Sequence, residues 1–250
     1  MILAIETATD VCGAAVVHEG RVIARSSISE KNIHSEKLLT MVDDVLLEAA
    51  VLLNDVDAIA VSIGPGSFTG LRIGLSTAKG LAMARQKPII AVPTLDALAN
   101  EYYRSSSKNS AGIVCPMIDA KRDEVYYCFY EVNAAGINRR SDYTIESITQ
   151  VGGRAGRYDT VVFVGDGVLK MEKMPGLKVG HRCFPEIVCD PGSVGIIAEQ
   201  EGKKLSAEVI STLEPLYIRD FVTTHPGRKR DLRSHPLPAA SQTSAHSFKG

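Results

Sequence analysis

The chain has 250 residues, of which 45% are apolar, and its formal net charge at pH 7 is −1. This length allows one large domain or two small lobes, and the apolar share is sufficient for a buried core. The near-zero charge excludes a global attraction to nucleic acid, although residues 222–250 carry five Lys or Arg residues against one acidic residue.

Residues 1–105 are predicted to form an α/β lobe. A strand, a polar turn and a hairpin of two strands with Glu19-Gly20 at its turn are followed by helices and strands in alternation. Pro88 ends the second helix, and Thr94 begins the third. The predicted strands are 2–7, 12–18, 21–27, 57–63 and 88–92, and the first helix spans 34–53.

Residues 106–221 repeat the opening layout after a serine-rich stretch. The strand predicted at 113–119 ends in Asp119, as the first strand ends in Glu6, and a polar turn and a strand at 124–132 follow. The repeat predicts two related lobes with mixed sheets. A strand at 160–165 and a helix at 193–204 continue the second lobe, and residues 222–250 are predicted to be a disordered basic tail.

Four glycines and a proline crowd the stretch 64–74, between a predicted strand and a helix. Gly64 and Gly66 suit a turn with positive φ, and Ser67 or Thr69 suits the helix N-cap. The spacing matches neither the P-loop nor the dinucleotide fingerprint.

Gly70 and Gly74 of this stretch lie one helical turn apart. Small residues at that spacing allow a very close approach on one helix face. The approaching group could be a neighbouring helix, a phosphate or another chain.

Apolar residues fill about half of the circumference of the helix 34–53, and one core-facing stripe needs only about 100°. The excess is explained either by deep burial or by a second face that contacts a partner subunit. We favour the partner face. The predicted interface consists of His34, Leu38, Met41, Val45, Gly70, Leu71, Gly74 and Ala78.

The five cysteines are odd in number and show no C-x-x-C spacing. This favours free thiols in a reducing compartment over disulfides or a zinc site. The first residues lack the basic stretch of a secretory signal, and no apolar run reaches the length of a membrane span. The sequence predicts a cytoplasmic protein without membrane contact.

Four stretches resemble the TsaB (YeaZ) family: ILAIETAT at 2–9, HSEKLL at 34–39, GPGSFTGLRIG at 64–74 and PLYIR at 215–219. The resemblance covers residues 1 to about 221. It implies an α/β, actin-like or Hsp70-like ATPase-type fold with two ribonuclease H-like lobes. The chain is short for two complete lobes, so we expect the second to be trimmed.

The resemblance also implies a role in making N6-threonylcarbamoyladenosine at position 37 of tRNA. The family is regarded as a non-catalytic scaffold that pairs with the catalytic relative TsaD, with the ATPase TsaE joining and tRNA contacted through the complex. A charge at Val45 or Leu38 is then expected to abolish pairing while the fold survives. We also expect a self-dimer when TsaD is absent.

TsaD carries two metal-binding histidines four residues apart on the corresponding helix. Here His34 takes the first position, but Leu38 takes the second. One imidazole cannot hold a catalytic metal, so we predict no metal site and expect His34 to begin the helix or to bond at the interface.

Actin-like folds bind ATP between their lobes, and the resemblance implies a vestigial nucleotide site at Thr7, Thr9, Asp10, Asp119 and Gly165. The alternative is that the acidic residues only cap strand ends. We expect no cofactor of the chain's own, with ATP or ADP at the interface of the complex.

Three other interpretations remain open. An actin-fold ATPase or small-molecule kinase would turn over nucleotide and lose that activity in Asp119→Ala. A metallopeptidase would need an H-E-x-x-H motif or a second helix histidine, which the sequence lacks. The tail would bind tRNA phosphates or be a solvated appendage, which we favour.

Overall fold

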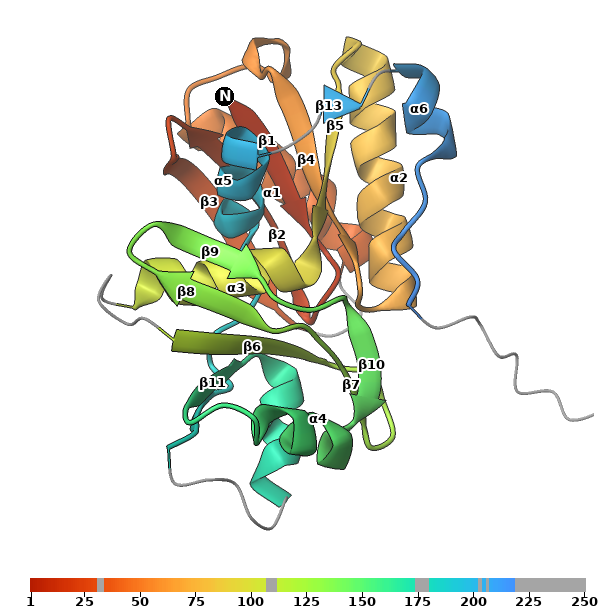
Figure 1. Cartoon of the computed structure of the whole chain (residues 1–250). Coiled ribbons are helices and arrows are strands. Elements are labelled where there is room, and N and C mark those ends of the chain that lie inside the picture. Colours follow the sequence, from red (N-terminus) through yellow and green to blue (C-terminus); the bar gives the residue numbers. More distant parts are fainter. Residues whose placement is uncertain (31–33, 107–111, 174–179, 202–203, 206, 219–250) are drawn as a thin grey trace, which may run out of the picture. The chain divides into compact units, whose positions relative to one another are not determined.

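A computed structural model of the chain describes residues 1–30, 34–106, 112–173, 180–201, 204–205 and 207–218. The predicted basic tail at 222–250 lies outside the described residues. The described part of the chain consists of two sheets, and helices connect their strands along the chain (Figure 1).

The first sheet has the strand order β13-β5-β4-β1-β2-β3. Neighbours among β1, β2 and β3 are antiparallel, whereas β4 is parallel to β1 and β5 is parallel to β4. Every residue of β1 is buried, as expected for an uninterrupted apolar strand with both faces covered. The strands are β1 (Ile2–Glu6), β2 (Val11–His18), β3 (Arg21–Ser29), β4 (Ala58–Gly64), β5 (Ile89–Pro93) and β13 (Lys204–Leu205).

Helices cover both faces of the first sheet. Leu3 and Ile5 pack in the cluster that contains α1 and α2, and Ile2 and Ala4 pack in the cluster that contains α3 and α5. Alternate side chains of β1 therefore pack into two different hydrophobic cores, one on each face of the sheet. The helices are α1 (His34–Glu48), α2 (Phe68–Arg85), α3 (Thr94–Ser105), α5 (Pro191–Glu201), α6 (Ala207–Thr212) and the 3-10 turn η1 (Leu53–Asp55).

The second sheet repeats the arrangement of the first. Its order is β10-β7-β6-β11-β12, with β8 also pairing with β6 and β9 with β8. Relative to β6, β7 is antiparallel and β11 parallel, as β2 and β4 are relative to β1. The predicted duplication is confirmed. The strands are β6 (Gly112–Asp119), β7 (Glu124–Tyr127), β8 (Tyr130–Asn133), β9 (Gly136–Arg139), β10 (Thr144–Ser147), β11 (Val161–Val164) and β12 (Arg182–Phe184).

The helical cover of the second sheet is reduced. On one face α4 (Ile148–Ala155) and the 3-10 helix η2 (Asp166–Lys173) have 8 residues each, whereas α1 has 15 and α2 has 18. The other face packs on α3, where Leu95 and Leu98 meet Val114. The fold is therefore the predicted α/β, actin-like pair of ribonuclease H-like sheets with a trimmed second half.

Both β13 and α5 follow the second sheet in the chain but belong to the first sheet and its core. The division into residues 1–105 and 106–221 stays a prediction.

None of the described helices is long and apolar enough to cross a membrane. None of the five cysteines, all of which lie in the described ranges, forms a disulfide, as their odd number and spacing predict.

Three predicted boundaries are wrong. The helix predicted at 193–204 ends at Glu201, and Lys204 belongs to β13. The helix predicted to 53 ends at Glu48, since Ala50 adopts a left-handed φ of 54°. The strand predicted at 124–132 is two strands, because Pro116 lies in the part of β6 opposite the break and has no N–H to donate to the ladder.

Candidate functional site

Polar residues that follow the first strand of each sheet line one cleft. A hollow of about 310 Å³ is bordered by Thr9 and Asp10 after β1, by the start of α2 and by Asp119 at the end of β6. An adjoining hollow is bordered by Thr9, Asp10, Gly165 and Asp166. Four of the five residues predicted for a nucleotide site are therefore brought together.

Thr7, the fifth predicted residue, does not reach the cleft. Its side chain is buried, and its hydroxyl donates a hydrogen bond of 2.8 Å to the carbonyl oxygen of Gly70. Thr7 thus joins β1 to α2, which corrects its expected role as a ligand contact.

Glu6, the last residue of β1, is turned into the protein. Its Oε1 accepts hydrogen bonds from the backbone N–H groups of Ala8, at 2.8 Å, and Thr9, at 3.1 Å. Its Oε2 accepts from the Cys189 thiol at 3.2 Å. Burial raises the pKa of this carboxyl group above its ordinary value, and the hydrogen bonds from Ser62, Cys189 and the turn partly oppose the shift. The amides of the turn are therefore engaged by the chain's own carboxylate.

The raised pKa makes stability depend on pH. A buried acid with a raised folded pKa lowers the free energy of unfolding as the pH rises from its unfolded pKa, near 4.5, up to its folded pKa. We expect wild type to lose stability relative to Glu6→Gln over that interval, with a constant difference below it. Urea unfolding of both proteins between about pH 4 and pH 8 measures this. Parallel pH profiles would contradict it.

Asp119, at the end of β6, is held by an amine from the same chain. Lys170 of η2 places its Nζ 2.7 Å from Oδ1 of Asp119 and donates to the carbonyl oxygen of Glu124 at 2.7 Å. Burial raises the pKa of Asp119, but hydrogen bonds from Lys170 and from the Lys121 N–H, with the charges of both lysines, outweigh this effect and hold the pKa below its ordinary value. Asp119 is thus an ion-paired carboxylate.

The turns after β1 and β6 do not offer the backbone N–H groups of Ala8, Thr9 and Lys121 to a phosphate. Turns that bind phosphate present free backbone N–H groups, but here those of Ala8 and Thr9 bind Glu6, and that of Lys121 binds Asp119. Across the described ranges, no three His, Cys, Asp or Glu side chains are grouped to hold a metal ion.

The glycine stretch packs against the turn after β1. A Cβ on Gly66 would lie 2.1 Å from the Ala8 carbonyl oxygen, and one on Gly70 would lie 2.0 Å from the Thr7 carbonyl oxygen. The N–H of Ser67 donates to the Ala8 carbonyl oxygen at 2.7 Å. The approaching group is therefore the chain's own β1–β2 turn.

Two local predictions for this stretch have different outcomes. Ser67 is the N-cap of α2 and accepts from the N–H of Gly70, as predicted. Gly64 has a φ of +113°, but Gly66 does not share a positive φ. Glycine is required at position 66 because a Cβ would not fit, and not because of the positive φ that the sequence analysis expected.

Seven of the eight residues predicted for a partner interface are buried within the chain. Those with side chains are at most 8% exposed, and most belong to the core between the first sheet and its two long helices. Their expected place on the surface is therefore wrong. They are Leu38, Met41, Val45, Gly70, Leu71, Gly74 and Ala78. His34 begins α1, but its side chain lies outside the described residues.

The exposed apolar side chains of the two helices are different ones. Leu39 is 57% and Leu47 81% exposed on α1, and Met83 is 72% exposed on α2. Leu39 and Leu47 are eight residues apart and share the outer face with Asp43 and Asp44. A leucine within a polar arc is the signal that could have identified them.

Lys170, the ion-pair partner of Asp119, is the residue that the sequence analysis missed. It becomes a neighbour of Asp119 only because η2, which follows β11, lies beside the end of β6. A lysine in a short polar segment carries no local signal of such a partner.

The fold and the cleft define an α/β protein of the actin-like class whose cleft residue Asp119 is ion-paired with Lys170 of its own chain. The family model "TsaD: tRNA N6-adenosine threonylcarbamoyltransferase" matches residues 21–178. The solved structure "YeaZ from Pseudomonas aeruginosa" is similar with a TM-score of 0.74 and 32% identity, covering 86% of this chain and 98% of that one. The chain belongs to the TsaB (YeaZ) family.

Several relatives bear the name "tRNA threonylcarbamoyladenosine biosynthesis protein TsaB". The one from Escherichia coli is 41% identical over 136 residues, which are 54% of this chain and 57% of that protein. The one from Bacillus subtilis is 28% identical over 235 residues, 87% of this chain and 93% of that protein. The chain spans little more than half the length of the first curated relatives, at 57% and 52%.

Proposed function

We propose that the chain is a non-catalytic scaffold subunit in the formation of N6-threonylcarbamoyladenosine at position 37 of tRNA. In this role it pairs with and activates a TsaD-type catalytic subunit. The names of its relatives and the matching TsaD family model support the pathway. The engagement of Glu6 and Asp119 with groups of the same chain supports a role without chemistry in this cleft.

The observation that carries the pairing is the outer face of α1. Leu39 and Leu47 are well exposed there, beside the acidic Asp43, Asp44 and Glu48. Apolar side chains rimmed by charges are typical of a protein–protein contact. A partner with an apolar patch and a basic rim would bury both leucines and complement the acids.

The other expected partners are those that the family resemblance implies. We place ATP or ADP at the contact between the two subunits, because the cleft of this chain uses its turn amides internally. A TsaE-type ATPase joins the complex, and tRNA is contacted through the catalytic subunit. Without TsaD, a second copy of this chain would cover the same face.

The test is Leu47→Asp, with Leu169→Asp as the matched control. Leu169 is also an exposed leucine, at 53%, but lies on η2 of the second half. We expect Leu47→Asp to reduce recovery of TsaD in a pull-down by about tenfold or more, and to lower modified adenosine in tRNA of cells depleted of their own subunit. Leu169→Asp should retain both the recovery of TsaD and the modification of tRNA.

Wild-type recovery of TsaD by Leu47→Asp would contradict the proposed contact face. Nucleotide turnover by the purified wild-type chain, lost in Asp119→Ala, would contradict the scaffold role and favour an actin-fold ATPase or kinase.

A further inference from the structure

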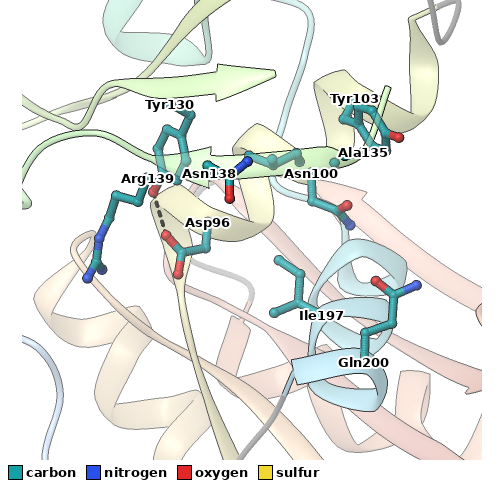
Figure 2. A pocket seen from close by; sticks show the side chains of 11 residues that line it. Asp96, Asn100, Tyr103, Tyr130, Ala135, Asn138, Arg139, Ile197 and Gln200 are labelled. Carbon is teal, nitrogen blue, oxygen red and sulfur yellow. Dashed lines mark hydrogen bonds between the residues drawn. The ribbon is translucent and has the colours of Figure 1, made fainter. Parts of the chain in front are cut away.

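A second cavity lies away from the cleft, among α3, the β8–β9 hairpin and α5. Its volume is about 640 Å³, within the range of small-molecule sites. Its lining includes Asp96, Asn100 and Tyr103 of α3, Asn138 of β9, and Ile197 and Gln200 of α5 (Figure 2). It shares no lining residue with the cleft between the sheets.

Asn100 is the informative residue of this cavity. It is only 8% exposed, and its Nδ2 has no hydrogen-bond partner among the residues that the structure describes. Buried polar groups are nearly always paired, because an unpaired one loses its hydration without compensation. A half-turn about χ2 exchanges the amide's donor and acceptor ends. An unpaired amide on a cavity wall indicates a polar ligand group.

Asp96 supplies the complementary acceptor. It lies four residues before Asn100 on α3, so the two side chains share one helix face with Cβ atoms about 5–6 Å apart. The Tyr130 hydroxyl donates to Oδ1 of Asp96, and the Tyr143 hydroxyl lies 2.8 Å from both oxygens. A carboxylate has about four acceptor positions, so Oδ2 retains capacity for a further donor.

The remaining lining limits the chemistry of the ligand. Asn138 and Gln200 add amides that both donate and accept, and Ile197 adds an apolar surface. The guanidinium of Arg139 is placed 4.6 Å from the ring centroid of Tyr143. Asp96 and Arg139 are the two charged residues among the lining residues that the structure describes, and their opposite charges give the lining no net charge that would select an ionic ligand. A neutral ligand with adjacent hydroxyl groups matches this set.

We propose that this cavity binds a small neutral ligand through a vicinal diol, with one hydroxyl donating to Asp96 and its neighbour bonding to the Asn100 amide. Free sugars and the ribose of nucleosides share this chemistry. The inference does not depend on the proposed role in tRNA modification.

The test is titration of the purified full chain, followed by calorimetry and by saturation-transfer NMR. One arm uses D-glucose and D-ribose, and the other uses uridine and adenosine, each with its 2-deoxy or 2′-deoxy analogue. We expect saturable binding in one arm, with the deoxy analogue weaker by about tenfold or more because an acceptor is left unpaired. Absence of saturable binding in both arms would overturn the proposal.

Asn100→Leu connects the binding to the site. Leucine has nearly the same size and removes the unpaired amide, so the urea midpoint should stay equal or rise while affinity for the diol falls about tenfold or more. Asn54→Leu, at an exposed asparagine of η1, is the control and should bind as wild type. Undiminished binding by Asn100→Leu would overturn the assignment. Asp96→Asn tests the same diol binding at the residue that accepts the other hydroxyl.

Discussion

Gly70→Ala is expected to lower the free energy of unfolding by about 3 kcal/mol or more, or to prevent folding. The added Cβ would lie 2.0 Å from the Thr7 carbonyl oxygen, a backbone atom that directly follows the buried strand β1. No side-chain rotation relieves this contact, so α2 must move away from β1. That movement would also break the hydrogen bond from the Thr7 hydroxyl to the carbonyl oxygen of Gly70.

Gly80→Ala is the matched control on the same helix. A Cβ at Gly80 would meet nothing within 4 Å, and alanine favours a helix interior over glycine by about 0.5–1 kcal/mol. This variant should therefore gain stability. Urea unfolding followed by circular dichroism compares the two, and similar small effects at both glycines would contradict the close packing of α2 on the turn.

Val45→Asp is expected to lower the free energy of unfolding by about 3 kcal/mol or more. Val45 is 0% exposed in the core between α1, α2 and the first sheet, where an aspartate would have an apolar surrounding. A charge at Val45 or Leu38 would thus destroy the fold, contrary to the expectation that pairing alone would be lost.

Leu47→Asp places the same charge two residues further along α1. Because Leu47 is 81% exposed, its free energy of unfolding should change by no more than about 0.5 kcal/mol. Thermal and urea unfolding of the two variants provides the comparison. A stable Val45→Asp, or an unfolded Leu47→Asp, would mean that α1 presents its other face to the sheet.

Much of the fold could be predicted from local patterns. The apolar stretches of β1, β4 and β6 identify buried strands, and Ser67 identifies a helix start, since these signals lie within a few neighbouring residues. The recurrence of strand, acid, turn and strand predicts the duplication that the order of the second sheet confirms.

The short elements of the second half could not be predicted in this way. β9 and β10 have four residues each, and their residues are half-buried or exposed, so no clear alternation marks them. Their pairing partners come from β8 and β7, which are themselves separated by a break opposite Pro116. Tertiary pairing, and not local propensity, determines such strands.

At the candidate site, too, some features could be predicted from local patterns and others could not. Its acids were identifiable because each ends a predicted strand, but what they bind was not. Asp119 and Lys170 are 51 residues apart, and Glu6 and Cys189 are 183 apart. No sequence pattern of a few residues contains both partners of such a pair.

The sequence by itself determined the buried strands, the duplicated layout, the demand for glycine at 66 and 70, and the family. Only the tertiary structure decided that the β1–β2 turn fills the space left by these glycines and that Leu39 and Leu47 face outward while Val45 faces the core. It also decided that Lys170 neutralises Asp119 and that Asn100 faces a cavity unpaired among the described residues. Periodicity and turn chemistry act between near neighbours in the chain, whereas these contacts join segments that meet only after the sheets have formed.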